Sequence, residues 1–188
     1  MRARRDWFWL ALLCLVATLL PDSAAGGLEY RRDAVLSGEL WRLLTGHFVH
    51  YSLRQALQDG CALALLAYAL ESIDGPRNLL PRLGLSAVVL SLLLVIAVPA
   101  MAGYRGASGL AMVLAGMLLR ALWRAHPAWR PGLAAIAVLL CGKMLADALG
   151  YAIDFTGLPL GVRVAWQVHA AGLVLGVLPE KFSGRAAA

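Results

Sequence analysis

Six stretches of mostly apolar residues alternate along the chain with short segments rich in glycine, proline and charge. Each stretch is roughly 16 to 20 residues long, which suits a hydrocarbon core about 30 Å thick. Hydrocarbon offers no partner to backbone N–H and C=O groups, so each stretch must be a helix or a strand of a closed barrel. The stretches show no alternation of period two, which excludes the barrel. The pattern predicts an all-α membrane protein, a six-transmembrane-helix bundle with spans near residues 7–21, 53–70, 83–102, 108–123, 132–151 and 160–178.

Composition supports this class. Hydrophobic residues make up 61% of the 188 residues, charged residues only 15%, and the mean hydropathy is +0.72. Soluble domains carry about a quarter charged residues. No internal repeat, low-complexity tract or composition shift divides the chain, so we expect one domain over residues 1–188.

The net charge of +6 sets the predicted topology. Basic residues lie in short loops and form no contiguous patch, so nucleic acid is not an expected partner. Ten of them fall on the side of the N-terminus and six on the other side. The positive-inside rule then places both termini in the cytoplasm, and the segment GYRGAS near the outer face. The first stretch also fits a signal peptide, since RARR precedes its apolar core and SAAG follows it. Cleavage there would leave the remaining topology unchanged.

The three cysteines, Cys14, Cys61 and Cys141, all lie inside apolar stretches. They show no Cys-x-x-Cys motif and no spacing typical of metal ligands. We interpret them as small buried hydrophobic residues. The sequence predicts no disulfide framework, no metal and no cofactor.

Polar residues inside the spans are the first candidates for chemistry, because burying them in lipid costs roughly 2.5 to 3.5 kcal/mol each. The second span opens with HFVHYSLRQALQDG, which contains His50, Gln55, Gln58 and Asp59. Gln55 and Asp59 are four residues apart and share a helix face. A helix end at the membrane interface is one interpretation. Asp59 lies about two turns inside, however, and a hydrated pocket open to the outer face accounts for all four residues.

A serine and a histidine on later spans form a second candidate. Ser108 begins the fourth span between Gly106 and Gly109, and His169 is the one ionisable residue in the apolar stretch of WQVHAAGLVLGVL. Gly172 and Gly176 follow it at the four-residue spacing that lets helices approach closely. A serine becomes nucleophilic when a base accepts its proton, and imidazole is suited to that near neutral pH. The backbone N–H of Ser108, at a helix N-terminus, could stabilise an oxyanion.

These motifs resemble the rhomboid family of intramembrane serine proteases. The resemblance is carried by GASG at 106–109, HAAGLVLG beginning at His169 and ELWRLLTGHFVH before the second span, in the same order over nearly the whole chain. It implies a six-helix bundle with a serine–histidine dyad, without a third acidic member, in a water-filled cavity. Ser108 then matches the nucleophile and His169 the general base. His50 matches a second-helix histidine, and Trp41 and Arg42 match a structured first loop lying partly in the membrane.

Three positions depart from the family pattern. Gln55 and Asp59 stand where a histidine and an asparagine commonly help to bind the oxyanion, and Met112 replaces a tyrosine that packs on the imidazole. The Gln55 amide can still donate a hydrogen bond, whereas an ionised Asp59 cannot. Asp59 could be protonated, orient Gln55 or a water, or hold Arg54 or Lys143. We favour a structural, orienting role.

The resemblance implies cleavage of single-span membrane proteins near the outer face of a bacterial inner membrane. The short chain is most similar to the rhombosortase subgroup, whose substrates end in a glycine-rich motif, a transmembrane helix and a basic tail. A general rhomboid specificity and transfer of the acyl group to another amine stay open. The alternative is an inactive rhomboid-like protein or a small transport-type bundle, in which Ser108 and His169 only pack. Lys143 and Asp147, four apart in the fifth span, predict an intrahelical ion pair or a contact to the substrate tail.

Overall fold

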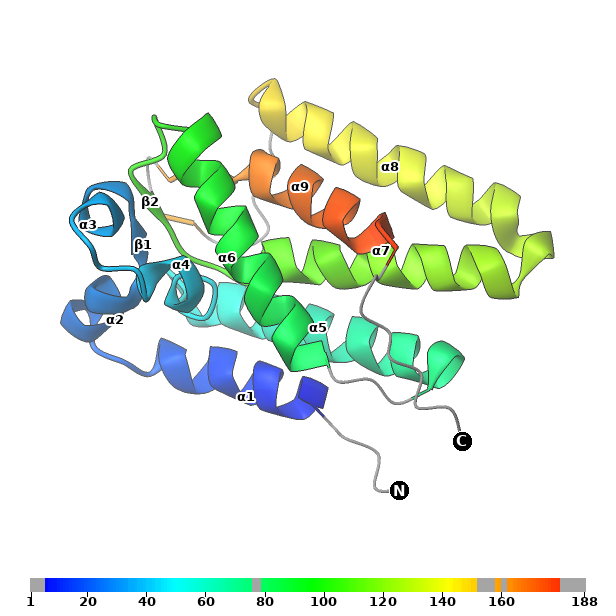
Figure 1. Cartoon of the computed structure of the whole chain (residues 1–188), viewed down its shortest axis with the longest axis horizontal. Helices are drawn as coiled ribbons and strands as arrows, with labels where there is room; N and C mark the ends of the chain where they lie inside the picture. Colours follow the sequence, from blue (N-terminus) through cyan, green and yellow to red (C-terminus); the bar gives the residue numbers. More distant parts are fainter. Residues whose placement is uncertain (1–5, 76–78, 152–157, 160–161, 180–188) are drawn as a thin grey trace.

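The apolar stretches fold as helices packed side by side, with small elements joining them at one end (Figure 1). The computed structural model describes residues 6–75, 79–151, 158–159 and 162–179. The elements in chain order are α1 (Asp6–Thr18), α2 (Asp22–Leu28), β1 (Tyr30–Arg31), α3 (Arg32–Leu36), α4 (Arg42–Thr45), α5 (Leu53–Asp74), α6 (Leu79–Ala97), β2 (Gly103–Tyr104), α7 (Ser108–Ala125), the 3-10 turn η1 (Pro127–Trp129), α8 (Arg130–Ala148) and α9 (Trp166–Val177).

Four of the described helical segments are long and apolar enough to cross a membrane: Leu53–Asp74, Leu79–Ala97, Ser108–Ala125 and Pro127–Ala148. At 1.5 Å per residue the α-helices within them are about 27 to 33 Å long, which matches the hydrocarbon core. Two shorter apolar helices, Phe8–Thr18 and Trp166–Val177, accompany them. The structure is that of an all-α, multi-pass membrane protein, and the count of six spans stays a prediction.

Helix boundaries differ from the predicted spans where proline and glycine set them. The structure describes α6 from Leu79, and the helix ends at Ala97, ahead of Pro99. α8 ends at Ala148, and Gly150 follows with a φ of +84° that a helix cannot continue through. The last helix begins at Trp166, and part of the predicted span 160–178 lies outside the described residues.

α7 lies at the centre of the bundle and contacts α5, α6, α8 and α9. Its closest partner is α9. A Cβ added to Gly116 would lie 2.5 Å from the carbonyl oxygen of Leu173, and one added to Gly176 would meet the carbonyl oxygen of Val113. Only glycine at these two positions allows the two backbones to approach so closely.

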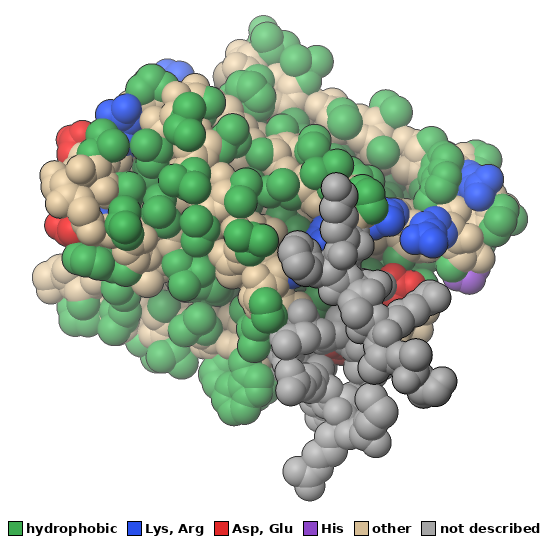
Figure 2. Space-filling model, in the orientation of Figure 1, with side chains coloured by type: hydrophobic (Ala, Val, Ile, Leu, Met, Phe, Trp, Pro, Cys, Tyr) green, Lys and Arg blue, Asp and Glu red, His purple; other side chains and the backbone are tan. Residues whose placement is uncertain are grey.

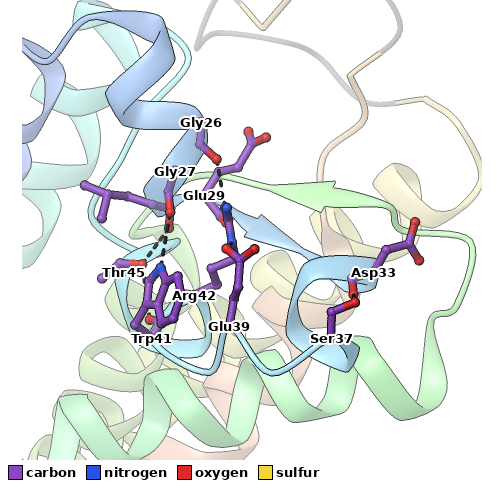
Figure 3. A network of polar contacts seen from close by, with 10 residues as sticks. Gly26, Gly27, Glu29, Asp33, Ser37, Glu39, Trp41, Arg42 and Thr45 are labelled. Carbon is purple, nitrogen blue, oxygen red and sulfur yellow. Dashed lines mark hydrogen bonds and ion pairs between the residues drawn. The ribbon is translucent and has the colours of Figure 1, made fainter.

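The segment between α1 and α5 is tied down by hydrogen bonds at the end of the bundle where α7 begins. β1 pairs antiparallel with β2, which joins this segment to the chain before α7. Arg42 Nη1 donates to the carbonyl oxygens of Gly26, at 2.7 Å, and Glu29, at 2.8 Å, while its Nε donates to Glu39 (Figure 3). Trp41 Nε1 donates to the carbonyl oxygen of Gly27. These bonds satisfy backbone groups that the short elements leave unpaired.

The side chain of His47 links the same segment to α6 through hydrogen bonds. The side chain is fully buried, and its Nε2 lies 3.0 Å from both the carbonyl oxygen of Ala87 and the hydroxyl of Ser91. Burial lowers the pKa of His47 to about 4, so the ring is neutral near pH 7. His47 therefore acts as a hydrogen-bonding core residue.

The prediction that all three cysteines are buried is wrong for two of them. Cys14 is buried, whereas Cys61 and Cys141 are exposed on the outside of the bundle. They share that surface with apolar side chains, such as Val138 and Leu139 on α8, that are about 70% exposed. Figure 2 shows that hydrophobic side chains cover much of the visible helical surface. In a bilayer this surface contacts lipid chains, so a small thiol is tolerated there.

Candidate active site

The serine and the histidine singled out in the sequence meet between α7 and α9. Ser108 is the first residue of α7, and His169 lies in the first turn of α9. The Ser108 hydroxyl lies 2.8 Å from His169 Nε2, which is hydrogen-bonding distance. His169 is buried, and its Nδ1 has no hydrogen-bond partner within the part of the chain that the structure describes. The pair therefore stands without a third, acidic member among those residues.

Glycine makes this meeting possible. A Cβ on Gly172 would collide with the carbonyl oxygen of Gly109, and a Cβ on Gly109 would collide with the side chain of Val168. The two helices thus come into backbone contact at the residue directly after Ser108 and about one turn after His169. The sequence-predicted packing residues Gly109, Gly172 and Gly176 all lie on this α7–α9 contact.

A pocket of about 310 Å³ opens onto the pair. It is large enough for several waters or an extended stretch of peptide. Its polar lining comes from the start of α5, the segments before α7 and α9, and α7, α8 and α9 themselves, and includes Gln55, Gln58, Asp59, Arg105, Ser108, Lys143, Arg163 and His169. Met112 also lines it, one turn after Ser108. His50 is not among the residues that line this pocket; it is buried, and its Nε2 lies 3.2 Å from Asp59 Oδ2.

Gly106 holds a backbone conformation that only glycine adopts without strain. Its φ is +134°, and a Cβ at this position would lie 2.6 Å from the Nε2 atom of Gln55. The Gly106 N–H donates to the carbonyl of Gly46, and its own carbonyl accepts from the Tyr104 hydroxyl at 2.6 Å. The turn before Ser108 is therefore fixed from both sides.

Gln55 is held at both ends of its amide. Its Oε1 accepts from the Tyr51 backbone N–H at 2.9 Å, and its Nε2 donates to the carbonyl of Arg105 at 3.1 Å. This pattern assigns the oxygen and nitrogen of the amide. One of the two N–H bonds on Nε2 points to Arg105, and a second donor stays on the same atom beside the Ser108 turn. The side chain can thus donate to an oxygen that forms in the pocket.

Asp59 accepts a hydrogen bond from the turn that precedes Ser108. Its Oδ2 accepts from the backbone N–H of Ala107 at 2.8 Å and lies 3.2 Å from Nε2 of His50. The His50 contact has the distance of an ion pair but lacks the alignment of a hydrogen bond. The described contacts of Asp59 therefore differ from the pairing with Arg54 or Lys143 considered from the sequence. By accepting from the Ala107 N–H, Asp59 fixes the residue directly before Ser108.

Removing this acceptor should destabilise the fold. Asp59→Ala leaves the buried N–H of Ala107 without a partner, which costs about 1 to 3 kcal/mol. Asp59→Asn keeps a side-chain oxygen and should stay close to the original stability. Thermal unfolding in detergent measures both variants, with Asp33→Ala, an exposed carboxylate on α3, as the control. If the asparagine variant unfolds as early as the alanine variant, the contact with His50 is the dominant one.

The charged pair predicted within one helix is confirmed. Lys143 Nζ contacts Asp147 Oδ2 on α8, and the Asp147 side chain is almost fully buried while that of Lys143 is half exposed. Lys143 also lines the pocket. A buried carboxylate neutralised in this way is tolerated inside a membrane.

Arg105 is a site residue that sequence reasoning did not single out. It donates to Glu29 at 2.7 Å, and its guanidinium lies 5.0 Å from the centre of the Tyr51 ring. Its carbonyl accepts from Gln55, so these contacts also fix the Gln55 amide. The one signal in the sequence was its place beside GASG. Its partner Glu29 lies 76 residues away and could not be identified from spacing.

Comparison with known proteins adds one finding. The sequence model of the Rhomboid domain matches residues 37–182, most of the chain, including every residue of the pocket described above. No curated protein matches the chain significantly.

Proposed function

Since the chain belongs to the rhomboid family of intramembrane serine peptidases, we propose that it cleaves membrane-anchored proteins through Ser108 and His169. The observation that carries this proposal is the 2.8 Å contact between the Ser108 hydroxyl and His169 Nε2 at the wall of a polar pocket. A nucleophile within hydrogen-bond reach of a base is the arrangement that acyl transfer requires.

The chemistry follows from this pair. His169 accepts the proton of Ser108 while Oγ attacks the peptide carbonyl carbon, and the new C–O bond forms a tetrahedral oxyanion. His169 then returns the proton to the leaving amine as the C–N bond breaks. Water hydrolyses the acyl-enzyme and regenerates Ser108. An amine in place of water would give transfer of the acyl group, which the same geometry permits.

The position of the pocket supports a proposal for the substrate class. It lies at the end of the bundle that holds the starts of α5, α7 and α9, and charge bias assigns this end to the outer face. A substrate helix must unwind there to expose a carbonyl. We therefore propose single-span membrane proteins as substrates, in a bacterial inner membrane with both termini of the enzyme in the cytoplasm. The narrower proposal is rhombosortase-type processing of a glycine-rich C-terminal tail.

A fluorophosphonate probe tests the function directly, because it phosphonylates an activated serine and leaves packing hydroxyls unmodified. Membranes that contain the protein should give one labelled band, which disappears in Ser108→Ala and persists in Ser37→Ala, where an exposed hydroxyl is removed. Absence of labelling in the original protein would favour the second candidate, an inactive rhomboid-like protein. That candidate is retained because Gln55, Asp59 and Met112 depart from the residues common in the family.

Gln55 has a predicted role of its own as an oxyanion donor. Gln55→Ala should slow turnover about 10²-fold, since one such donor contributes roughly 2.7 to 4 kcal/mol in the transition state. Gln55→Glu keeps an oxygen for the Tyr51 N–H but loses the donor, so it should be at least as slow. Turnover of a reporter substrate measures both variants. A Gln55→Glu variant with unchanged turnover would show that Gln55 only positions the backbone.

A further inference from the structure

A second, separate pocket lies at the opposite end of α7. α8 packs loosely, and among its residues only Leu133, Met144 and Asp147 are buried. The gap that it leaves against α7 and α9 has a volume of about 440 Å³. Leu119 of α7 and Val177 of α9 contribute to its apolar wall. It shares no lining residue with the pocket at Ser108.

Two arginines face this gap. Arg120 and Arg124 of α7 line it one turn apart, and none of the described residues that line it is acidic. The Arg120 Nη1 atom donates to the carbonyl of Leu178 at 3.2 Å. A guanidinium carries five donors, so further N–H groups on Arg120 are available to a ligand. Figure 2 shows Lys and Arg side chains gathered at this end of the molecule.

Trp123 lies between the two arginines in sequence and lines the same gap. Arg130, at the start of α8, lies over its ring at 5.6 Å and donates to its carbonyl oxygen at 3.2 Å. Tryptophan and arginine near the ends of spanning helices are typical of the headgroup level of a bilayer. The last turn of α7 ends at Ala125, which places the guanidinium groups at that level and the apolar wall deeper.

From these features we infer that the gap is a binding site for an anionic phospholipid. Its phosphate binds between Arg120 and Arg124, and an acyl chain fills the space between α8 and α7. Guanidinium and phosphate form charge-assisted hydrogen bonds that are often bidentate. An empty apolar gap forfeits packing contacts, which a chain supplies. Basic pockets between spanning helices on the cytoplasmic side bind such headgroups, and charge bias places this end there. The site does not depend on the proposed peptidase activity.

Quenching of Trp123 by brominated lipid tests the site, because bromine quenches indole fluorescence on contact. The protein is reconstituted in phosphatidylcholine vesicles that contain increasing fractions of acyl-brominated phosphatidylglycerol. The part of the quenching that is absent from Trp123→Phe reports the pocket. It should saturate at a low fraction of phosphatidylglycerol, and acyl-brominated phosphatidylcholine should need a fraction roughly tenfold higher.

The arginines supply the matched variants. Arg120→Gln with Arg124→Gln should remove the preference for phosphatidylglycerol, whereas Arg31→Gln, an exposed arginine at the other end, should keep it. If the double variant does not fold, Arg124→Gln alone, at an exposed position, should weaken the preference several-fold. Equal quenching by both lipids, an unchanged preference in these variants, or full displacement by millimolar inorganic phosphate would each overturn the assignment of a phospholipid site.

Discussion

Ser108→Ala and His169→Ala are each expected to abolish cleavage of a co-expressed substrate, with a loss of about 10⁴-fold or more. Either change leaves a nucleophile without a base or a base without a nucleophile, because the two side chains are in direct contact. A suitable reporter has one transmembrane helix with small residues at its outer border. Immunoblotting for the cleaved fragment measures the result at matched protein levels.

The controls remove the same residue types elsewhere in the chain. Ser37→Ala lies on the exposed segment after α3, and His126→Ala lies in the turn before α8, where its ring stacks on Trp129. Both should cleave normally. Retained cleavage in Ser108→Ala would remove that hydroxyl from the mechanism, and retained cleavage in His169→Ala would assign the base to another group.

The expected size of this effect reflects how the two residues cooperate. In a serine–histidine pair, the loss of either member costs about as much as the loss of both. The double variant Ser108→Ala with His169→Ala should therefore be no slower than either single variant. An additive loss in the double variant would indicate two independent contributions, which a shared proton transfer excludes.

The spanning helices were predictable because the lipid interior offers no hydrogen-bond partner to backbone N–H and C=O groups, so every residue there must have these groups paired within the protein. Continuous apolar runs had to be helices, and the structure has four helical segments long and apolar enough to cross a membrane, with shorter apolar helices in the first and last predicted spans. The segment from Asp22 to His50 was not predictable, since short polar elements have no periodicity to read. Its fold depends on long-range bonds such as those of Arg42 to Gly26 and Glu29.

Some contacts of the candidate site could be predicted from the sequence, and others could not. Glycine spacing around Ser108 and after His169 indicated a close helix contact, and the resemblance paired the two side chains. The bond from Ala107 to Asp59 joins residues 48 apart and leaves no mark in the sequence. His50 was grouped with Gln55 and Asp59 because it is close to them in the sequence, but it precedes α5, is buried, and contacts Asp59 without lining the pocket. Short-range spacing predicts a shared face only within one helix.

Gly172→Ala is the second change with a large expected effect. The added Cβ would strike the carbonyl oxygen of Gly109, a backbone atom that cannot move aside as a side-chain rotamer does. Overpacking of this kind costs typically 1 to 3 kcal/mol, and here relief requires α9 to shift away from α7. The variant should unfold at a lower temperature in detergent, and its labelling by a fluorophosphonate should fall with it.

Gly142→Ala separates this clash from any general effect of alanine. Gly142 lies in α8 with nothing within 4 Å of an added Cβ, so the change should be neutral or stabilising by up to about 1 kcal/mol through helix propensity. Gly176→Ala, which meets the Val113 carbonyl, should behave like Gly172→Ala although it lies one turn farther from His169. The reactivity of Ser108 would then depend on how closely two backbones approach along α7 and α9. If Gly172→Ala keeps both its melting temperature and its labelling, the two helices do not approach so closely, and His169 reaches Ser108 in some other way.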